Sequence, residues 1–156
     1  MHLSTFTDYA MRTLIYIGLQ RDRLVTIAEI ARAYGISENH LMKVVHHLAQ
    51  RGRVETIRGK GGGLRLAMAP ASINIGTLVR ATEGSTGLLQ CLDGQSDCCI
   101  QRACRLTGIL REAQDALFAV LDKYTLDDLL CDEPALAGIL MRQQLVGPNI
   151  EELERT

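Results

Sequence analysis

Two short helical patterns separated by a glycine constrain the fold of this chain more than any other feature of its sequence. The first begins at Thr26, whose hydroxyl can bond the backbone of Glu29 while Glu29 bonds back, and it ends at Gly35. The second begins after Ser37, a good N-cap residue, and its apolar residues fall at i, i+3, i+4 and i+7. These residues are Leu41, Val44, Val45 and Leu48. Two such helices joined by a glycine-containing turn predict a helix-turn-helix, with a further helix expected before it at residues 7–20.

The polar face of the second helix favours contact with DNA. Its hydrogen-bond donors recur at i, i+4, i+7 and i+11 with no acid among them, as Asn39, Lys43, His46 and Gln50. Glu38 lies in the first turn, where the helix dipole stabilises a carboxylate. We predict that Ser37, Asn39, His40 and Lys43 contact DNA, and that the last three read the bases.

A hairpin with a basic tip follows the second helix directly. The alternating residues of its strands are Val54, Thr56, Leu64 and Leu66. Glycines at residues 59 and 61–63 let the backbone approach a phosphate, and positive charge comes from Arg58, Lys60 and Arg65. A solvated glycine-rich loop has the same composition, but after a helix-turn-helix pattern the hairpin predicts a wing laid along a DNA backbone. A nucleotide-binding loop fits poorly, because these glycines do not open a helix.

Charge divides the chain at Pro70. Residues 1–70 hold ten lysines and arginines against five acidic residues, giving +5, whereas residues 71–156 hold seven against thirteen, giving −6. The basic half predicts an anionic partner such as double-stranded DNA. With 156 residues the chain is long enough to bury a core without disulfides. No apolar run approaches the ~18 residues of a membrane span and no signal segment opens the chain, so we expect a cytoplasmic protein without membrane contact.

All five cysteines lie in the acidic half, and four of them fall within fourteen residues, as Cys91, Cys98, Cys99 and Cys104. An odd count in a chain expected in the cytoplasm argues against a disulfide framework, and the spacings match neither a zinc ribbon nor a thioredoxin-type pair. Soft thiolates from one loop suit an iron–sulfur cluster or zinc, so the segment predicts a metal or redox site. The isolated Cys131 is interpreted as a small core residue.

A long apolar stripe runs from Leu106 to Tyr124 at steps of three and four residues. It predicts a long helix that needs a partner surface, either the basic half of its own chain or a second copy. Because a helix-turn-helix protein reads two half-sites one helical turn apart, we expect a homodimer through this helix. A shorter helix is expected at residues 73–81, and Thr125 with Asp128 forms a second capping pair.

The predicted fold class is mainly α with a small β-hairpin, a winged helix-turn-helix joined to a long dimerisation helix. Residues 1–70 form the DNA-binding region, residues 71–130 the metal-site loop and dimerisation helix, and residues 131–156 a C-terminal helix with a mobile tail. No nucleophile and base stand together as a catalytic set, so an enzyme is not expected. His46 and His47 are interpreted as a DNA-facing or solvated pair.

Four segments resemble one family of transcription factors. They are Phe-Thr-Asp-Tyr-Ala at residues 6–10, the glycine-rich wing at 59–63, Cys-Arg-Leu at 104–106 and Tyr-Thr-Leu at 124–126. Over about residues 1–130 the chain is similar to the winged-helix iron–sulfur regulators, and among them most of all to the nitric-oxide-sensing repressors. The resemblance implies a homodimer in which three loop cysteines bind a cluster beside the first helix of the other protomer. It also implies that an aspartate of that helix, here Asp8, is the fourth ligand.

The cysteine spacing departs from the family pattern at one step. The family has five residues between successive ligands, which fits Cys98 and Cys104, whereas six separate Cys91 from Cys98. If Cys99 is taken in place of Cys98, seven residues separate it from Cys91 and four separate it from Cys104. We expect Cys91, Cys98 and Cys104 as metal ligands, with Cys99 as the alternative to Cys98 and Asp8 of the other protomer as the fourth. The resemblance favours a 4Fe–4S cluster, with a 2Fe–2S cluster as the alternative.

Asp8 has a second interpretation from its position alone. An acid in the first turn of a helix pairs readily with an arginine at i+4, which here is Arg12. If Asp8 binds the cluster in one state and Arg12 in the other, the two residues form a switch that biases the DNA-binding region.

The function that follows is a homodimeric repressor of transcription. It would sense nitric oxide through the cluster, and nitrosylation or loss of the cluster would release the operator DNA. Alternatives of the same class are a sensor of iron or cluster supply and a cysteine-thiol redox regulator. An electron-transfer iron–sulfur protein, from a different class, would have no use for the basic wing.

Overall fold

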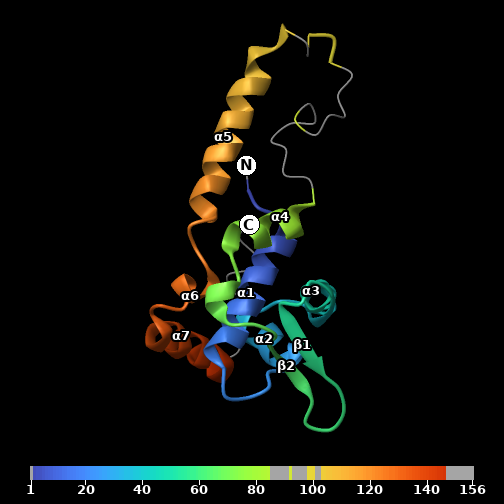
Figure 1. Cartoon of the computed structure of the whole chain (residues 1–156). Helices are drawn as coiled ribbons and strands as arrows, with labels where there is room; N and C mark the ends of the chain where they lie inside the picture. Colours follow the sequence, from blue (N-terminus) through green and yellow to red (C-terminus); the bar gives the residue numbers. More distant parts are fainter. Residues whose placement is uncertain (1, 85–91, 93–97, 101–102, 147–156) are drawn as a thin grey trace.

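The structure, a computed structural model, describes residues 2–84, 92, 98–100 and 103–146, with the backbone alone for residues 133 and 141–146. Its elements are α1 (Thr5–Leu19), α2 (Ile27–Tyr34), α3 (Glu38–Gln50), β1 (Val54–Ile57), β2 (Gly63–Leu66), η1 (Pro70–Ser72), α4 (Ile75–Glu83), α5 (Arg105–Leu121), α6 (Leu126–Leu129) and α7 (Glu133–Val146). The predicted fold class, mainly α with a small β-hairpin, is confirmed (Figure 1). The tail predicted to be mobile comprises residues 146–156; Val146 is the last residue of α7, and residues 147–156 lie outside the described residues.

α1 lies at the centre of the molecule and supplies much of the core (Figure 1). Its Leu14 and Ile17 belong to the same buried cluster as Leu41 and Leu48 of α3. The full burial of one such side chain stabilises the fold by about 1.5–3 kcal/mol. The helix begins two residues earlier than predicted, because the hydroxyl of Ser4 caps it. α1 is therefore the support on which α3 rests.

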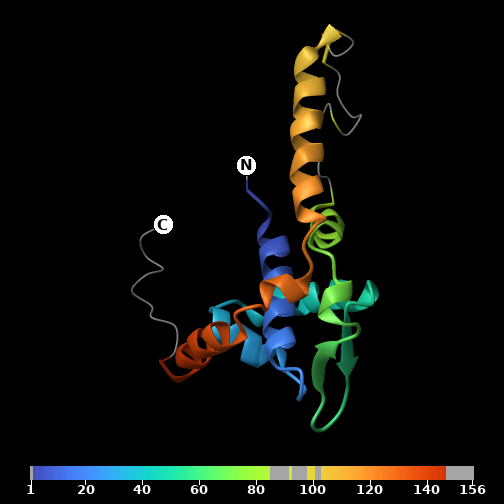
Figure 2. The same cartoon turned by 60° about the vertical axis from the view of Figure 1, so that its left-hand side comes forward.

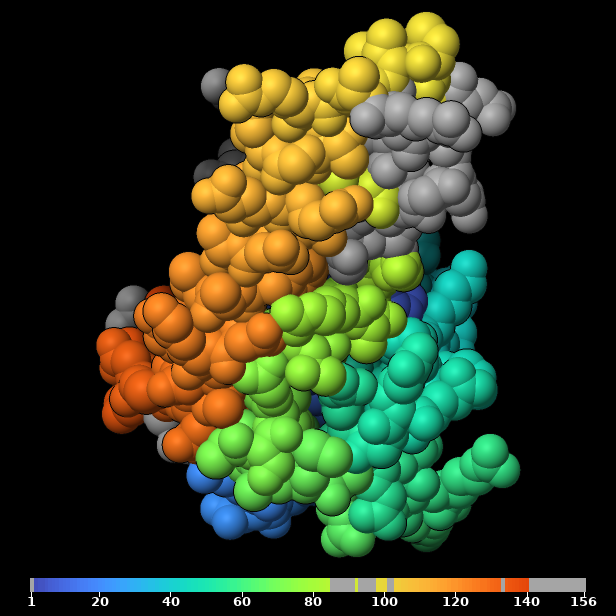
Figure 3. Space-filling model, turned by 45° about the horizontal axis from the view of Figure 1, so that its top comes forward, coloured from blue at the N-terminus to red at the C-terminus, as the bar shows by residue number. Residues whose placement is uncertain are grey.

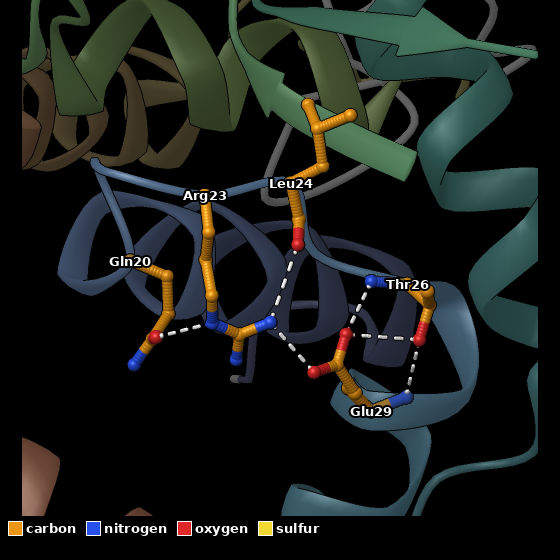
Figure 4. Close-up of polar contacts among 5 residues, drawn as sticks. All are labelled: Gln20, Arg23, Leu24, Thr26 and Glu29. Carbon is orange, nitrogen blue, oxygen red and sulfur yellow. Dashed lines mark hydrogen bonds and ion pairs between the residues drawn. The ribbon is translucent and has the colours of Figure 1, made fainter. Parts of the chain in front are cut away.

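Polar contacts before α2 set the start of the helix-turn-helix (Figure 4). The backbone amide of Glu29 donates to the Thr26 hydroxyl at 3.2 Å, and the Thr26 amide donates to the Glu29 carboxylate at 2.6 Å, which is the predicted capping box. Arg23 donates to the same carboxylate at 2.7 Å. α2 ends at Gly35, whose φ of 63° is the left-handed conformation that glycine adopts most easily.

The capping carboxylate keeps its charge at neutral pH. Burial alone would raise the pKa of Glu29, but the hydrogen bonds from Thr26 and Arg23 outweigh it and hold that pKa below the ordinary value. Because the pKa is lowered in the folded state, the contribution to stability is complete at neutral pH and is lost only on acidification through that lowered pKa.

The hairpin is anchored at its base and projects at its tip. β1 and β2 are antiparallel, with Val54 opposite Leu66. Val25, in the loop before α2, exchanges backbone hydrogen bonds of 3.0 and 2.7 Å with Leu64. Gly59 and Gly61 in the tip have φ of 101° and 80°, where other residues are strained. Figure 2 shows the tip extending away from the helices, as a wing does.

The end of α5 is fixed on α4. Arg80 donates to both carboxylate oxygens of Asp122, at 2.6 and 2.7 Å, and its guanidinium lies 4.2 Å from the ring centroid of Phe118. A side chain at Gly76 would collide with Asp122, so glycine permits the close approach of the two helices. Beyond this contact α5 extends away from the other helices (Figures 1 and 2). Phe118 is its one buried residue.

Cys131 is not the core residue that the sequence suggested. Its side chain is exposed, with Sγ 3.6 Å from the backbone oxygen of Asp127. The core contribution of this region comes instead from Leu126, Leu130 and Leu140. The error arose because the burial of a single cysteine in a short helical connection has no periodic pattern from which to read it.

Candidate DNA-binding surface and sensor site

One face of α3 is polar and exposed, as the sequence predicts. Asn39, His40 and Lys43 are exposed, whereas Leu41 and Leu48 are fully buried. Ser37, also predicted to contact DNA, is exposed at the N-cap position, and its hydroxyl makes no capping bond. Figure 3 shows α3 beside the hairpin on one face of the molecule. The residues predicted to read bases and those predicted to bind phosphate are therefore brought together.

Two ring contacts hold α3 against the first turns of α1. Phe6 meets His47 edge-on, with 5.4 Å between ring centroids, and Tyr9 lies 6.3 Å from His40. The Nε2 atom of His47 is buried and has no hydrogen-bond partner within the described part of the chain. The interpretation of His47 as DNA-facing or solvated is therefore wrong, because this side chain packs between the two helices. His46 is exposed and agrees with the interpretation.

The three basic residues predicted on the wing differ in their surroundings. Arg58 and Lys60 are exposed at the tip, and the ion pairs found among the described residues do not include them. Arg65 instead donates to the carboxylate of Glu55, its partner across the sheet, at 2.8 Å. This hydrogen bond raises the pKa of Arg65. Because Glu55 already neutralises part of its charge, we expect Arg65 to contribute less to phosphate binding than Arg58 and Lys60.

Two more arginines, which the sequence analysis missed, extend the basic surface between α3 and the wing. Arg51 is exposed at the C-cap of α3, and Arg53 is half-buried just before β1. Burial and the neighbouring charge of Arg51 lower the pKa of Arg53. A phosphate bound beside them would relieve the repulsion of these like charges. The signal that could have found them is Arg-Gly-Arg at residues 51–53, directly after the recognition helix.

Asp8 and Arg12 form the ion pair that their spacing predicts. The Asp8 carboxylate oxygens lie 3.0 Å from Nε and 2.9 Å from Nη2 of Arg12. The guanidinium also lies 5.6 Å from the ring centroid of Tyr34 in α2. The two side chains are 44% and 42% exposed, so this pair stabilises the helix by only about 0.3–0.5 kcal/mol. Asp8 can therefore leave Arg12 at little cost.

The start of α1 is tied to the end of α4, from which the cysteine segment continues. The Ser4 amide donates to the Glu83 carboxylate at 2.8 Å, and the Thr7 hydroxyl donates to that of Thr82 at 2.7 Å. Burial would raise the pKa of Glu83, but hydrogen bonds that its carboxylate accepts from Thr7 and Ser4 lower it below the ordinary value, so the carboxylate stays charged. The turn that carries Asp8 is thus held to the helix that leads into the cysteine segment.

The predicted cysteine ligands are described in part. Cys91 lies outside the described residues, Cys98 and Cys99 are exposed, and Cys104 is half-buried at the N-cap of α5. Contacts with the backbone and hydroxyl of Thr107 lower the pKa of the Cys104 thiol, which favours the thiolate that binds metals. Over the ranges that the structure describes, no three His, Cys, Asp or Glu residues gather into a metal-binding group. The donor set of thiolates with one carboxylate suits iron, and the ligand assignment stays a prediction.

Residues 3–132 match the model of the Rrf2 family, described as an iron-dependent transcriptional regulator. The chain belongs to the Rrf2 family. The HTH-type transcriptional regulator NsrR of Bacillus subtilis is 46% identical to it over 146 residues, which cover 92% of this chain and 100% of the relative. NsrR of Halalkalibacterium halodurans is 45% identical over 142 residues, covering 90% and 97%. The resemblance inferred from the sequence is confirmed at the level of the family and of these relatives.

Solved structures of Rrf2 regulators share the fold. CymR of B. subtilis, described as the global cysteine regulator, superposes with a TM-score of 0.65 at 28% identity and covers 83% of this chain and 95% of its own. IscR from T. potens also has a TM-score of 0.65, at 26% identity, with coverage of 85% and 88%.

Membership of the Rrf2 family makes this chain a DNA-binding regulator of transcription and not an enzyme. The exposed face of α3 and the basic wing are the parts of the molecule suited to that role. In the described ranges, no helix is both long enough and apolar enough to span a membrane.

Proposed function

We propose that this Rrf2 protein is a homodimeric cytoplasmic repressor that senses nitric oxide through an iron–sulfur cluster and then releases its operator. The observation that carries the proposal is Cys104, half-buried at the N-cap of α5 with a lowered thiol pKa, together with Cys91 and Cys98, in a chain 46% identical to NsrR of B. subtilis. Nitric oxide as the signal is inferred from the resemblance to the nitric-oxide-sensing repressors. The cysteines are the residues that would bind the cluster with which nitric oxide reacts.

A second copy of the chain is the proposed occupant of the apolar face of α5. Leu106, Ile109 and Val120 are each at least half exposed, and Tyr124 continues the same stripe just past the helix. Exposing an apolar stripe of this length to water is unfavourable, and covering it with a matching stripe of a second protomer lowers the free energy. Two copies joined in this way would present two α3 helices to half-sites about 34–36 Å apart.

The cluster would be held by Cys91, Cys98 and Cys104 of one protomer and by Asp8 of the other, with Cys99 as the alternative to Cys98. When bound, the cluster would supply iron atoms that react with nitric oxide. The protein's own contribution is the charge of its donors, since Cys104 is already biased toward thiolate. Asp8 is the one oxygen donor in a set of soft thiolates and is the weakest match to the metal.

Asp8 and Arg12 are the proposed switch. In the described state Asp8 pairs with Arg12, and the low cost of breaking that exposed pair allows Asp8 to move between Arg12 and a ligand site. Phe6 and Tyr9 flank Asp8 on α1 and touch His47 and His40 of α3. A change at Asp8 can therefore alter the position of α3, and with it the spacing of the two recognition helices.

Alanine at both Arg58 and Lys60 is expected to weaken binding to all DNA sequences about equally. Each side chain contributes one phosphate contact, so the slope of log affinity against log salt should fall by about two. Alanine at Asn39 should instead relax preference at particular base pairs with little change in the slope. The measurement is fluorescence anisotropy of labelled duplexes at several salt concentrations. If both variants change the slope equally, the division into phosphate-binding and base-reading residues is wrong.

Two alternatives use the same residues. Four cysteines within fourteen residues would also serve a thiol redox switch. The description of the family as iron-dependent favours a sensor of iron or cluster supply. Electron transfer is the least supported function, because it leaves the basic wing and the polar face of α3 unused.

Anaerobic purification followed by an absorbance spectrum and an iron count tests the cluster. We expect visible absorbance and either four irons or two irons per cluster, according to its type. A colourless, iron-free protein after anaerobic reconstitution would refute the cluster and favour the thiol switch.

A further inference from the structure

One apolar side chain interrupts the exposed polar face of α3. Met42 is 50% exposed, although its helix neighbour Leu41 is fully buried. It lies three residues after Asn39, next to Lys43 and four residues before His46, all of which are exposed. The helix therefore presents a thioether side chain beside Asn39 and Lys43, two of the residues proposed to read bases.

Met42 lies between the exposed polar face of α3 and the side that packs on the core. At 3.6 residues per turn, Met42 lies about 60° around the helix from Asn39. His40 and His47, which contact α1, lie about 140–160° around the helix from Met42. The buried Val45 lies about 60° from Met42, on the side away from Asn39. Met42 thus borders the core, yet half of its side chain stays exposed on the side of Asn39.

The chemistry of the major groove offers one apolar group that a side chain can recognise. Each base pair presents donors and acceptors there, but only thymine adds a methyl group, at C5. Methionine is unbranched and polarisable, so it adapts well to an apolar partner of small size. We propose that Met42 contacts the C5-methyl group of a thymine and so sets a preference for a T·A pair in each half-site. This inference rests on the proposed base-reading role of α3.

The expected loss of binding free energy is modest at one contact and doubles in a dimer, so the two fold-changes in affinity multiply. Removing one methyl-sized group from an apolar contact lowers affinity by about fourfold. A dimer that makes the contact in both half-sites should therefore lose about fifteenfold when both methyl groups are removed.

Deoxyuridine substitution tests the contact, because it removes the thymine methyl group and leaves the base pairing intact. The full-length, anaerobically reconstituted protein would first select its preferred duplex from a random pool. Symmetric pairs of thymines in that duplex would then be replaced by deoxyuridine, one pair at a time, and binding followed by fluorescence anisotropy. We expect about fifteenfold weaker binding at one symmetric position, and Met42→Ala should bind the thymine and deoxyuridine duplexes equally there.

Two further variants control the test. Met42→Leu keeps an apolar side chain and should retain part of the discrimination. Met68→Ala removes another exposed methionine, two residues past β2, and should retain all of it. Full discrimination in Met42→Ala, or none at any position in the wild type, would overturn the Met42 proposal alone. Failure of the wild type to enrich any duplex would refute the base-reading role of α3 and the Met42 proposal with it.

Discussion

Replacing Cys104 by alanine is expected to abolish the visible absorbance of the anaerobically reconstituted protein and its tight operator binding, while leaving a folded dimer. Cys104 is half-buried and stands before the first turn of α5, outside the core, so its loss should cost little stability. The substitution removes one of the three proposed thiolate ligands, the one whose thiol pKa is lowered by its contacts with Thr107. Absorbance spectra, iron counts and circular dichroism of the variant measure these effects.

Cys131→Ala is the matched control for this experiment. Cys131 is exposed on the segment between α6 and α7 and is not among the proposed ligands. The control should keep both its absorbance and its operator binding. Full absorbance in Cys104→Ala would contradict the ligand assignment, whereas equal loss in both variants would point to general oxidation of the thiols.

Replacing Ile109 by glutamate is expected to separate the dimer without unfolding the protomer. Ile109 is 60% exposed on α5 in the single chain, so glutamate is tolerated there. In the proposed dimer the same carboxylate would be buried without a partner, at a cost of about 3–5 kcal/mol. Dimer affinity should fall on the order of 100-fold or more, and operator binding should fall with it. Analytical ultracentrifugation and anisotropy on one operator measure the two losses.

Ile139→Glu separates the effect of the interface from that of a new charge. Ile139 is 58% exposed on α7, so the two substitutions match in chemistry and exposure. The Ile139 variant should remain dimeric and bind the operator normally. A dimeric Ile109→Glu variant would place the dimer interface elsewhere on the molecule.

The DNA-binding half of the fold could be predicted in detail because its signals are local. The capping box of Thr26 and Glu29, the glycine at the end of α2 and the apolar stripe of α3 each act within one or two turns, and all are present as predicted. The wing could be predicted for the same reason, because the alternating strand residues and the glycines of its tip lie within one short segment.

Features that depend on contacts between distant residues could not be predicted. His47 looks like a polar helix residue until α1 brings Phe6 against it, and the pairing of Arg65 with Glu55 depends on the register of the hairpin. The burial of Arg53 depends on tertiary packing in the same way. Asp8 shows the same limit at the candidate sensor site. Its pairing with Arg12 follows from helix spacing, whereas its role as a ligand comes from family resemblance alone.

The central claim is that nitric oxide controls operator binding through the cluster. It is tested by titrating the anaerobic cluster-bound dimer with nitric oxide while cluster absorbance and operator binding are followed in the same sample. We expect the two signals to fall together, with operator binding lost by the point at which the cluster has fully reacted. Undiminished operator binding after complete reaction of the cluster would contradict the account.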